Sequence, residues 1–459
     1  MTTSASSRGQ ARAVVIGGGL AGISAALALA DGGWRTTLLE ARPRLGGATY
    51  SFSRHGRLVD TGQHVLLRCY TAHRALLERL GVSEDVPVQP RFAVPVLRLG
   101  HAPVWLRRGR LGPAPSHLLP ALLGYRLLSP ADRLSACRAA LALRRVGPED
   151  PASDRRTFGD WLAAHGQSVD AIEALWRLIC LPALNLEPAE ASLALAAKVF
   201  RTALLDDVTA ADIAVPQVPL GRLYDEPARR ALSRAGVRVR TGCRVLTVAG
   251  DDSAPLVRTS DGDLTPDAVV VAVPHQQAAR MLPDSASPDR DRWAALQASP
   301  IVNVHVRYDR PVTTLPFAAG VRTPVQWVFD RTTATGGPGQ YLVVSLSGAG
   351  HEVACRSTDL LARYVTALAE LFPVARDARV LDAFVTREPR ATFRQGVGTA
   401  VIRPATRTRW PTVVLAGAWT ATGYPDTTEG AVRSGLAAAE VLGLPRSMAS
   451  PHESREVLA

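Results

Sequence analysis

The stretch from Ala13 to Gly47 constrains the fold of this chain more than any other, because a strand, a glycine-rich turn and a helix follow one another without a gap. Ala13 to Ile16 is a short run with β-branched residues that predicts a buried strand. Leu20 to Ala30 is rich in alanine and leucine and predicts a helix. Between them three glycines stand at G-x-G-x-x-G spacing: Gly17, Gly19 and Gly22.

Each glycine has its own expected role. Gly17 permits a tight turn, Gly19 lets the backbone approach a pyrophosphate, and Gly22 lets the helix pack closely on the strand. The free N–H groups and the dipole of the helix N-terminus favour phosphate. A second strand, Thr36 to Leu39, leads to Glu40, which lies 23 residues beyond Gly17, close to where an acidic residue meets a ribose hydroxyl. The stretch therefore predicts a dinucleotide site.

Composition limits the remaining classes of function. With 459 residues, 47% of them hydrophobic and 20% charged, the chain has the length of two or three globular domains. The formal net charge is +12, yet Lys198 is the only lysine, so arginine carries the surplus. Such a surface favours anionic partners. There is no zinc-finger spacing and no basic arm with interleaved aromatics, so we expect no nucleic-acid partner.

Cysteines and the N-terminus give expectations about the compartment. The five cysteines form no C-x-x-C pair, so we expect neither a disulfide framework nor a metal site. Met1 to Arg12 is polar and lacks the apolar run of a secretory signal. The apolar segment from His117 to Leu128 is interrupted by Pro120 and Gly124, and is too short to span a membrane. We expect a cytoplasmic protein.

A polar loop follows the first two strands. His55 and Gly56 predict a hairpin turn, and a helix is expected from about Tyr70 to Leu80, closed by Gly81. Between them stand four polar or small residues, Thr61, Gly62, Gln63 and His64. From the residues alone, this loop either faces the reactive ring of a cofactor or is an ordinary solvated loop.

From Pro87 to Pro219 the sequence predicts helices punctuated by prolines. Ser129 and Pro130 are a typical helix start, and the helix that follows carries Leu134, Cys137 and Leu141 on one face and several arginines elsewhere. Two interpretations stay open. The leucines form a core-facing stripe, or the helix rests with the nearby Trp105 segment on a membrane surface as a basic amphipathic helix. Further helix starts are expected at Thr157 and Ser168.

The remaining sequence returns to strands. A helix from Glu226, strands near Val237 to Arg240 and Arg244 to Val248, a hairpin turn at Asp261 and Gly262, and an apolar strand from Asp267 to Val273 are expected to resume the nucleotide domain. Ile301 to Tyr308 alternates cleanly. With Val325 to Phe329 and Gln340 to Ser347, and a helix from Leu360 to Phe372, it predicts a second domain with an antiparallel sheet. A last strand, Thr412 to Leu415, and a helix from about Glu429 to Leu442 return to the cofactor.

These pieces resemble the flavin amine oxidase and phytoene desaturase superfamily. Within it, the chain is similar to the hydroxysqualene dehydroxylases, also called squalene-associated FAD-dependent desaturases. The segments that carry this likeness are Val59 to Gly81, Ser299 to Val312, Val325 to Arg331 and Leu415 to Gly435. The resemblance spans nearly everything from Arg12 to Gly443, and the Gly62-Gln63-His64 group and the C-terminal segment are its most specific parts.

The resemblance implies an α/β fold with a Rossmann-like FAD-binding domain and an inserted α+β substrate domain of the flavin amine oxidase type. It implies FAD-binding segments at 1–86, 220–290 and 401–445, and substrate-domain segments at 87–219, mostly helical, and 291–400, an antiparallel sheet plus a helix. Residues 446–459 are expected to be a flexible tail.

The resemblance also implies which residues hold FAD. Gly17, Gly19 and Gly22 with Glu40 would bind the ADP half, Val245 would contact the adenine, and the other expected contacts are Leu20, Ala21, Ala41, Arg42, Gly46, Gly47, Ala48, Gly62, Gln63, His64, Gly417, Thr428, Glu429 and Gly430. Two residues depart from the superfamily pattern. Ala48 stands where an arginine commonly follows the paired glycines, and Ala418 stands where an aspartate commonly follows the C-terminal Ala-Gly.

Lysine scarcity bears on the reaction. Many amine oxidases of the superfamily place a lysine near the flavin N5 on the strand that corresponds to Ser299 to Val302, but no lysine stands there and Lys198 is distant in sequence. Amine oxidation is therefore disfavoured.

The resemblance implies reductive removal of the hydroxyl of hydroxysqualene to give squalene, a hopanoid and triterpenoid precursor, with reduced FAD as hydride donor. A general acid must then help the hydroxyl leave, and we expect His64 in this role with Tyr424 and Asp426 behind it. The partners implied are a long-chain isoprenoid substrate and, through the basic helices, a membrane surface. The sequence does not identify the electron donor. Two alternatives remain: an oxidative carotenoid-type desaturase, and a non-catalytic isoprenoid carrier on the same fold.

Overall fold

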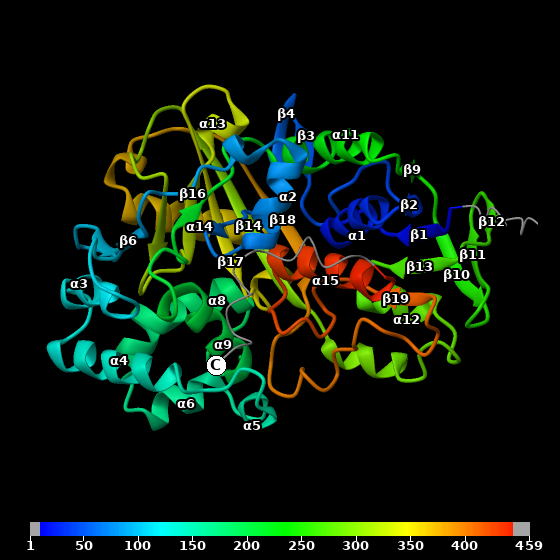
Figure 1. Cartoon of the computed structure of the whole chain (residues 1–459). Coiled ribbons are helices and arrows are strands. Elements are labelled where there is room, and N and C mark those ends of the chain that lie inside the picture. The colour runs from blue at the N-terminus through cyan, green and yellow to red at the C-terminus, as the bar shows by residue number, and fades with distance from the viewer. Residues whose placement is uncertain (1–9, 444–459) are drawn as a thin grey trace, which may run out of the picture.

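The computed structural model describes residues 10–443 and contains a five-stranded parallel sheet in the order β19-β13-β1-β2-β9 (Figure 1). Its strands are β1 (Arg12–Ile16), β2 (Arg35–Glu40), β9 (Arg238–Thr241), β13 (Ala268–Val271) and β19 (Val413–Leu415). The central strands are buried and apolar, as parallel strands covered on both faces must be. The sheet joins three distant parts of the chain, which confirms the predicted return to the first domain.

Helices α1 (Leu20–Asp31) and α15 (Thr428–Val441) pack closely on each other at one side of this sheet (Figure 1). The contact depends on small residues, because a Cβ added to Gly435 would lie 2.1 Å from the carbonyl oxygen of Ala21. The C-terminal helix is thereby held against the helix that follows the glycine motif. Neighbouring helices are α2 (Thr71–Leu80), closed by left-handed Gly81 as predicted, α10 (Leu220–Tyr224) and α11 (Glu226–Arg234).

A seven-stranded sheet forms the second architecture, in the order β18-β14-β17-β16-β15-β6-β7. Its strands are β6 (Ala93–Leu97), β7 (Val104–Arg107), β14 (Ser299–Tyr308), β15 (Phe317–Gly320), β16 (Trp327–Asp330), β17 (Gln340–Ser347) and β18 (Val380–Thr392). Helix α14 (Ser357–Leu371) packs on it. Its strands pair antiparallel except β15 with β6, so the fold is the expected α/β architecture with an α+β insertion.

Four of these strands, namely β6, β7, β15 and β18, did not follow from the sequence. Strands β6 and β7 lie in the segment expected to be mostly helical, where prolines such as Pro95 suggested helix boundaries; Pro95 instead sits within β6. Strand β18 is half-exposed and rich in charged residues, so it lacks the alternation that identifies its neighbour β14. Pairing with distant partners fixes β6, which lies beside β15, and β18, which lies beside β14, whereas β7 pairs with its chain neighbour β6.

The rest of residues 87–219 is largely helical, and its helices gather beside the seven-stranded sheet (Figure 1). They are α3 (Leu119–Leu123), α4 (Pro130–Leu143), α5 (Pro151–Asp154), α6 (Phe158–Ala164), α7 (Val169–Ala171), α8 (Arg177–Leu184) and α9 (Leu193–Phe200), with π-helical turns at Ile172–Trp176 and Arg201–Leu205. Ser129, Thr157 and Ser168 cap α4, α6 and α7 as predicted.

The face that α4 buries is a correction. Leu134 and Leu141 are both more than half exposed, and α4 instead buries Ala136, Ala139 and Leu143. Small alanines allow close packing on the neighbouring helices, so the leucine stripe does not face the core. Of the two interpretations of this helix, the core-facing stripe is wrong.

Shorter elements complete the fold. They are the hairpin β3 (Ser51–Arg54) and β4 (Arg57–Asp60), the pair β5 (Leu66–Leu67) and β8 (Ile213–Ala214), the small sheet β10 (Val245–Gly250), β11 (Pro255–Thr259) and β12 (Gly262–Leu264), and the helices α12 (His275–Met281) and α13 (Thr332–Thr335). The turn predicted at His55-Gly56 is present, and the turn predicted at Asp261-Gly262 lies one residue earlier, at Ser260-Asp261, because Gly262 begins β12. The expected C-terminal tail, 446–459, lies outside the described residues.

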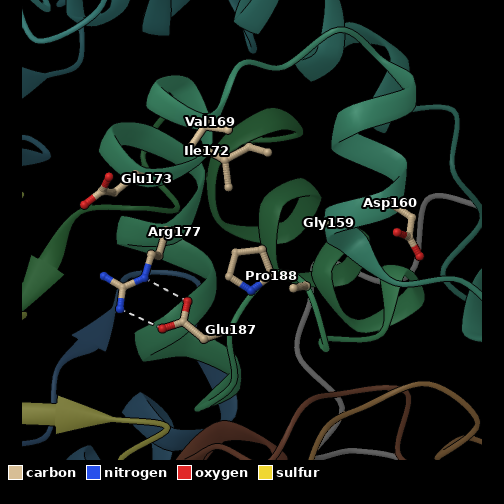
Figure 2. Close-up of a pocket in the computed structure, with 9 residues that line it drawn as sticks. Gly159, Asp160, Val169, Ile172, Glu173, Arg177, Glu187 and Pro188 are labelled. Carbon is tan, nitrogen blue, oxygen red and sulfur yellow. Dashed lines mark hydrogen bonds and ion pairs between the residues drawn. The ribbon is translucent and has the colours of Figure 1, made fainter.

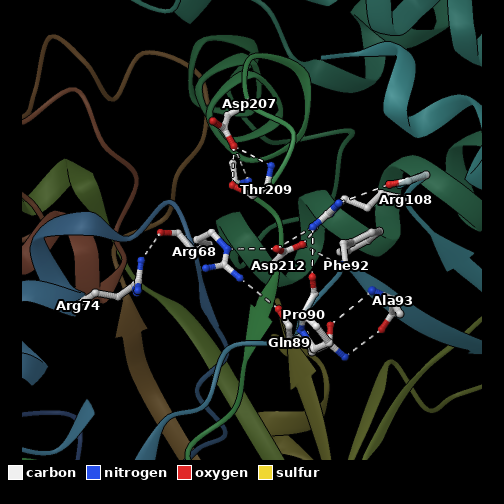
Figure 3. A network of polar contacts seen from close by, with 12 residues as sticks. Arg68, Arg74, Gln89, Pro90, Phe92, Ala93, Arg108, Asp207, Thr209 and Asp212 are labelled. Carbon is white, nitrogen blue, oxygen red and sulfur yellow. Dashed lines mark hydrogen bonds and ion pairs between the residues drawn. The ribbon is translucent and has the colours of Figure 1, made fainter. Parts of the chain in front are cut away.

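A buried carboxylate ties the inserted segment to the nucleotide-binding segment (Figure 3). Asp212 accepts hydrogen bonds from the guanidinium of Arg108 at 2.8 and 3.0 Å, from Arg68 Nε at 3.1 Å and from the Phe92 N–H at 2.7 Å. Its side chain is fully buried. Two arginines from different parts of the chain thus share one acidic partner.

Candidate functional site

The turn after β1 has the geometry that the glycine spacing predicts. Gly17 has a φ of +107°, and its N–H donates to the carbonyl of Leu39 at 2.8 Å. A Cβ on Gly22 would lie 1.8 Å from the carbonyl oxygen of Gly17, closer than any side chain can approach. The first and third glycines are therefore required by the backbone itself.

The second glycine is different, because a side chain there would not clash with the protein. A Cβ on Gly19 would approach no heavy atom closer than the Cα of Gly47, which is at the ordinary contact distance of 3.8 Å. Gly47 has a φ of +60°, and a Cβ on it would lie 2.9 Å from the Gly19 Cα. Gly19 is the N-cap of α1, and no side chain accepts a hydrogen bond from the first turn. Gly19 and Gly47 thus form a glycine cradle beside the free N–H groups of the first turn of α1, as a pyrophosphate requires.

Glu40 lies at the same edge of the sheet. Its carboxylate accepts from the Gly18 N–H at 2.7 Å and from the Arg42 N–H at 2.8 Å. These bonds fix the carboxylate beside the glycine turn, and each oxygen keeps a further lone pair that suits a ribose hydroxyl. The Cys243 N–H donates to the Glu40 carbonyl at 3.1 Å, which brings the start of β10 and Val245 next to Glu40.

Although Ala48 replaces the arginine common in the superfamily, another arginine, Arg44, lies close by, and it was not identified from the sequence. The Arg44 Nη1 donates to the carbonyl of Gly47 at 2.9 Å, and its guanidinium lies 3.4 Å from the centre of the Tyr50 ring. Burial, and then the charge of Arg42, lowers the pKa of Arg44. The guanidinium of Arg44 therefore supplies a positive charge next to Gly47, although residue 48 is an alanine.

The C-terminal predicted residues reach the same edge of the sheet through β19. The Ala416 N–H donates to the carbonyl of Val271 on β13, and Gly417, with a φ of +139°, donates to Ser434 Oγ at 2.8 Å. Because β13 also pairs with β1, Gly417 and Gly17 follow the carboxyl ends of strands in one sheet. The fold thus brings together groups that are 400 residues apart.

The side chains at the start of α15 serve the packing of α2. The Glu429 carboxylate accepts from the N–H groups of Ala72 and His73, at 3.2 and 2.8 Å, and pairs with Arg433 at 2.7 Å. It supplies the cap that α2 lacks locally. The Gly430 N–H is taken by Thr427 Oγ1 at 3.1 Å. Any cofactor contact by these residues must use other backbone atoms.

The polar loop from Asp60 to His64 is held rigidly, not solvated. Asp60 is buried and accepts from Ser51 Oγ at 2.6 Å, from the Leu220 N–H at 2.8 Å and from Arg331 at 3.1 Å. The carbonyl of Thr61 accepts from Asn303 Nδ2 and from Thr386 Oγ1, both at 3.0 Å. The loop is therefore clamped between the hairpin and the seven-stranded sheet.

Two buried polar atoms at this loop have no protein partner among residues 10–443. They are His64 Nδ1 and Asn303 Oδ1. An unpaired buried polar group costs about 1–3 kcal/mol, so each of these atoms would gain from a partner that the protein does not supply. Asn303 was not identified from the sequence as a site residue; the signal was its place on the polar face of the alternating strand, with His305 and Arg307.

The protonation of the candidate acids differs. Burial is the main cause that lowers the pKa of His64, although nearby Asp60 opposes it, so the imidazole is neutral at neutral pH. Burial raises the pKa of Asp426 to about 6, against the opposing effects of the Phe393 N–H and Arg403. A carboxyl with this pKa carries a proton part of the time near neutrality, whereas a neutral imidazole is a poor acid.

Asp426 is positioned by its neighbours. Its Oδ2 accepts from the Phe393 N–H at 2.9 Å and its own N–H donates to Gln395 Oε1 at 2.8 Å, which leaves Oδ1 as the natural position of the proton. Arg403 is buried nearby, and burial lowers its pKa to about 10. The carboxyl group is thus fixed in a site that disfavours its charge.

Tyr424, the third candidate, lies between two cations. Lys198 Nζ and Arg433 Cζ are each 4.5 Å from the centre of its ring. Although Lys198 is distant in sequence, the fold brings it against the candidate catalytic loop. It does not lie on β14, where Ser299 and Pro300 stand.

Replacing Asp426 with asparagine is expected to change the pH dependence of stability. Because the pKa of Asp426 is raised on folding, its contribution is favourable below the ordinary pKa and is lost as pH rises through about 6. The difference in free energy of unfolding between Asp426→Asn and wild type should therefore shift in favour of the variant by about 2–3 kcal/mol between pH 4 and pH 8.

Thermal unfolding of the FAD-saturated proteins at pH 4, 6 and 8 checks this result, with exposed Asp252→Asn as the control. A difference from wild type that stays constant with pH would contradict the raised pKa.

A separate hollow of about 510 Å³ lies beside α6, α7 and α8, and contains none of the predicted site residues (Figure 2). Its one arginine, Arg177, is already paired with Glu187 through two hydrogen bonds of 2.8 and 2.6 Å. The hollow therefore adds nothing to the site.

Metal ligation and membrane crossing have no structural support within residues 10–443. No group of three or more His, Cys, Asp or Glu side chains there could hold a metal ion. None of the helices in this range combines the length and the apolar character needed to cross a bilayer.

Comparison with known proteins extends these observations. Residues 20–442 match the family model described as flavin containing amine oxidoreductase. The chain is 29% identical to hydroxysqualene dehydroxylase of Rhodopseudomonas palustris over 93% of this chain and 97% of the relative. It is 23% identical to a probable zeta-carotene desaturase of Synechococcus elongatus over 94% of this chain and 98% of the relative. A solved putrescine oxidase bound to putrescine has a TM-score of 0.72 at 19% identity, covering 94% of this chain and 98% of that chain.

Proposed function

The chain belongs to the flavin-containing amine oxidoreductases and is an FAD-dependent oxidoreductase, and we propose that it removes the hydroxyl group of hydroxysqualene to give squalene. The observation that carries the proposal is the similarity to hydroxysqualene dehydroxylase along almost the full length of both chains. The fixed, charge-disfavouring surroundings of Asp426 and His64 support it, because the reaction needs a buried proton source.

The glycine cradle is where the pyrophosphate of FAD would bind. The N–H groups of the first turn of α1 would contact it, Glu40 would hold the ribose, and Arg44 would take over the role of the arginine that is absent at Ala48. The loop from Gly62 to His64, with its two unpartnered buried atoms nearby, suits the polar edge of the ring system. Gly417, which follows β19 at the same edge of the parallel sheet, would approach the cofactor from the C-terminal segment.

When bound in its reduced form, FAD would supply a hydride to the carbon that loses its oxygen and would become oxidised. The protein must give one proton, so that the C–O bond breaks and the oxygen leaves as water. We assign this proton to Asp426, whose pKa is near 6, in preference to His64, whose buried imidazole is neutral. His64 would then contact the substrate oxygen, and Tyr424 would stay between its two cations.

The experiment that tests the reaction is product analysis by mass spectrometry, with hydroxysqualene and chemically reduced enzyme. We expect squalene from wild type and a product yield reduced about 10²-fold or more in Asp426→Asn. Retention of full turnover by this variant would remove Asp426 from the role. Conversion of phytoene under oxidising conditions, without squalene formation, would overturn the proposed reaction.

A carotenoid-type desaturase is the second candidate. The similarity to the probable zeta-carotene desaturase favours it, since it also extends over 94% of this chain. The two candidates share the fold and the flavin and differ in the direction of electron flow. The non-catalytic carrier does not hold, because the family is one of flavin enzymes.

Access from a lipid surface is part of the proposal. Five leucines of the segment 111–141 are exposed, namely Leu111, Leu119, Leu123, Leu134 and Leu141. Four arginines lie close to one another near this segment. Burial, and then the charges of Arg107, Arg110 and Arg108, lower the pKa of Arg91. Apolar side chains beside a basic cluster suit an anionic bilayer, from which an isoprenoid would enter.

Replacing Leu123, which is 63% exposed, with aspartate is therefore expected to weaken binding to anionic vesicles about tenfold. Vesicle flotation measures this effect. The control is Val374→Asp, an exposed apolar residue that follows α14 in another part of the fold. Equal loss in both variants, or no flotation of wild type, would contradict docking through the leucines.

A further inference from the structure

A second charged pocket lies away from the glycine cradle. It has a volume of about 240 Å³ and is lined by the β3–β4 hairpin, the loop that follows α13, and the starts of β17 and β18. Its charged residues are three arginines and one aspartate, Arg54, Arg57, Arg307 and Asp382, which leaves a formal charge of +2. None of these residues belongs to the predicted FAD contacts.

The single carboxylate in this pocket is already taken. Asp382 accepts from Arg54 Nε at 3.0 Å and from Arg54 Nη2 at 2.9 Å, in the two-bond geometry that guanidinium and carboxylate prefer. Arg54 also lies 4.1 Å from the centre of the Phe384 ring. The other two arginines form no ion pair with Asp382, although its negative charge partly offsets the effect of Arg57 on Arg307.

Arg57 and Arg307 are held in place by neutral groups. The guanidinium of Arg57 rests on Gly337, whose φ is +99°; a Cβ at that position would lie 2.6 Å from the Arg57 Cζ. Arg307 is buried, donates to the Pro338 carbonyl at 3.1 Å and lies 4.7 Å from the centre of the Tyr341 ring. Within residues 10–443 neither arginine has a carboxylate within 4 Å.

This arrangement is electrostatically incomplete. Burial, and then the positive charge of Arg57, lowers the pKa of Arg307. Two neighbouring guanidinium groups that are preorganised yet lack a counter-ion repel each other, and an oxyanion between them would remove that cost. The volume is below the 300 Å³ or so at which small-molecule pockets begin, so the pocket suits one charged group of a ligand.

We propose that this pocket, built by Arg57 and Arg307 on the β3–β4 hairpin and β14, binds a phosphate-type oxyanion, specifically a pyrophosphate group. Two guanidinium groups match two phosphate units, and the two negative charges of an esterified pyrophosphate balance the formal charge of +2. The group is either free pyrophosphate or part of a dinucleotide. The inference does not depend on the proposed reaction.

Calorimetric titration of the FAD-loaded enzyme with sodium pyrophosphate tests the site, and a parallel titration with NADPH distinguishes the two sources. We expect saturable binding of pyrophosphate that weakens as salt is raised. Arg57→Ala should weaken it at least tenfold, and Arg57→Lys, which keeps the charge without the fork, should give an intermediate affinity. The control is Arg379→Ala, an exposed arginine one residue before β18 that does not line the pocket.

NADPH binding that is at least as tight and equally sensitive to Arg57→Ala would assign the site to a dinucleotide, and binding of pyrophosphate alone would assign it to the free anion. No binding by wild type up to about 1 mM, or an equal loss in Arg57→Ala and Arg379→Ala, would overturn the proposal. Flavin absorbance and the melting temperature of each variant check that the fold is retained.

Discussion

Alanine at Gly19 is expected to remove most FAD binding while leaving the apoprotein as stable as wild type. The new Cβ would meet only the Cα of Gly47 at 3.8 Å, so the protein itself has room for it. Gly19 has an ordinary extended conformation, with a φ of −76°, so alanine introduces no backbone strain. The methyl group would nevertheless occupy the cradle over the free N–H groups of α1, and losing one charge-assisted hydrogen bond costs about 1.5–3 kcal/mol. FAD affinity should therefore fall about tenfold or more.

Gly22→Ala makes the matched comparison. Here the Cβ would lie 1.8 Å from the Gly17 carbonyl oxygen, so the helix must shift, and we expect a loss of about 3 kcal/mol in stability with or without FAD. Gly350→Ala is the neutral control, because a Cβ there has no heavy atom within 4 Å. Thermal unfolding and FAD titration of the three apoproteins separate the two effects. Wild-type FAD affinity in Gly19→Ala would contradict the cradle.

Asparagine at Asp212 is expected to be the most destabilising change outside the cofactor site. The carboxylate is fully buried, and its loss would leave Arg108, whose side chain is only 9% exposed, without a counter-ion. Removing one member of a buried ion pair typically costs about 3–5 kcal/mol. The variant should unfold at clearly lower denaturant concentration than wild type at pH 7. Exposed Asp263→Asn, which should match wild type, is the control.

The same carboxylate predicts a pH dependence. Burial raises the pKa of Asp212, but the hydrogen bonds from Arg108, Phe92 and Arg68 outweigh it, and the pKa lies below its ordinary value of 3.8. The stabilisation is therefore complete above that value and is lost as pH falls through the folded pKa. The difference in free energy of unfolding between wild type and Asp212→Asn, measured by denaturant titration, should become smaller below about pH 4. A gap that widens with acid would contradict this assignment.

Local pattern was sufficient for the parallel sheet and its turn. The spacing of Gly17, Gly19 and Gly22, the apolar strands on either side and the acid at Glu40 each follow from short-range constraints: a positive φ, a close helix contact and a buried strand. Such constraints act within a few residues, so they are legible in the sequence. Helix caps at Ser129, Thr157 and Ser168 were predictable for the same reason.

The polar surroundings of the site were not predictable in this way. The Asn303 amide is oriented by the carbonyl of Thr61, over 240 residues away, which accepts from Nδ2, and its Oδ1 has no protein partner. The pKa of Asp426 is raised because distant segments bury it. The outward leucines of α4 depend likewise on which helices pack against its alanines.

The sequence by itself determined the nucleotide-binding motif, the alternation of parallel and antiparallel segments, and the family likeness. Only the tertiary structure decided which buried groups lack partners, which candidate acid has a raised pKa, and that Arg57 and Arg307 meet in one pocket. The physical reason is that hydrogen-bond satisfaction and desolvation are set by neighbours from several chain segments at once, whereas backbone conformation at a glycine is set by the residue itself.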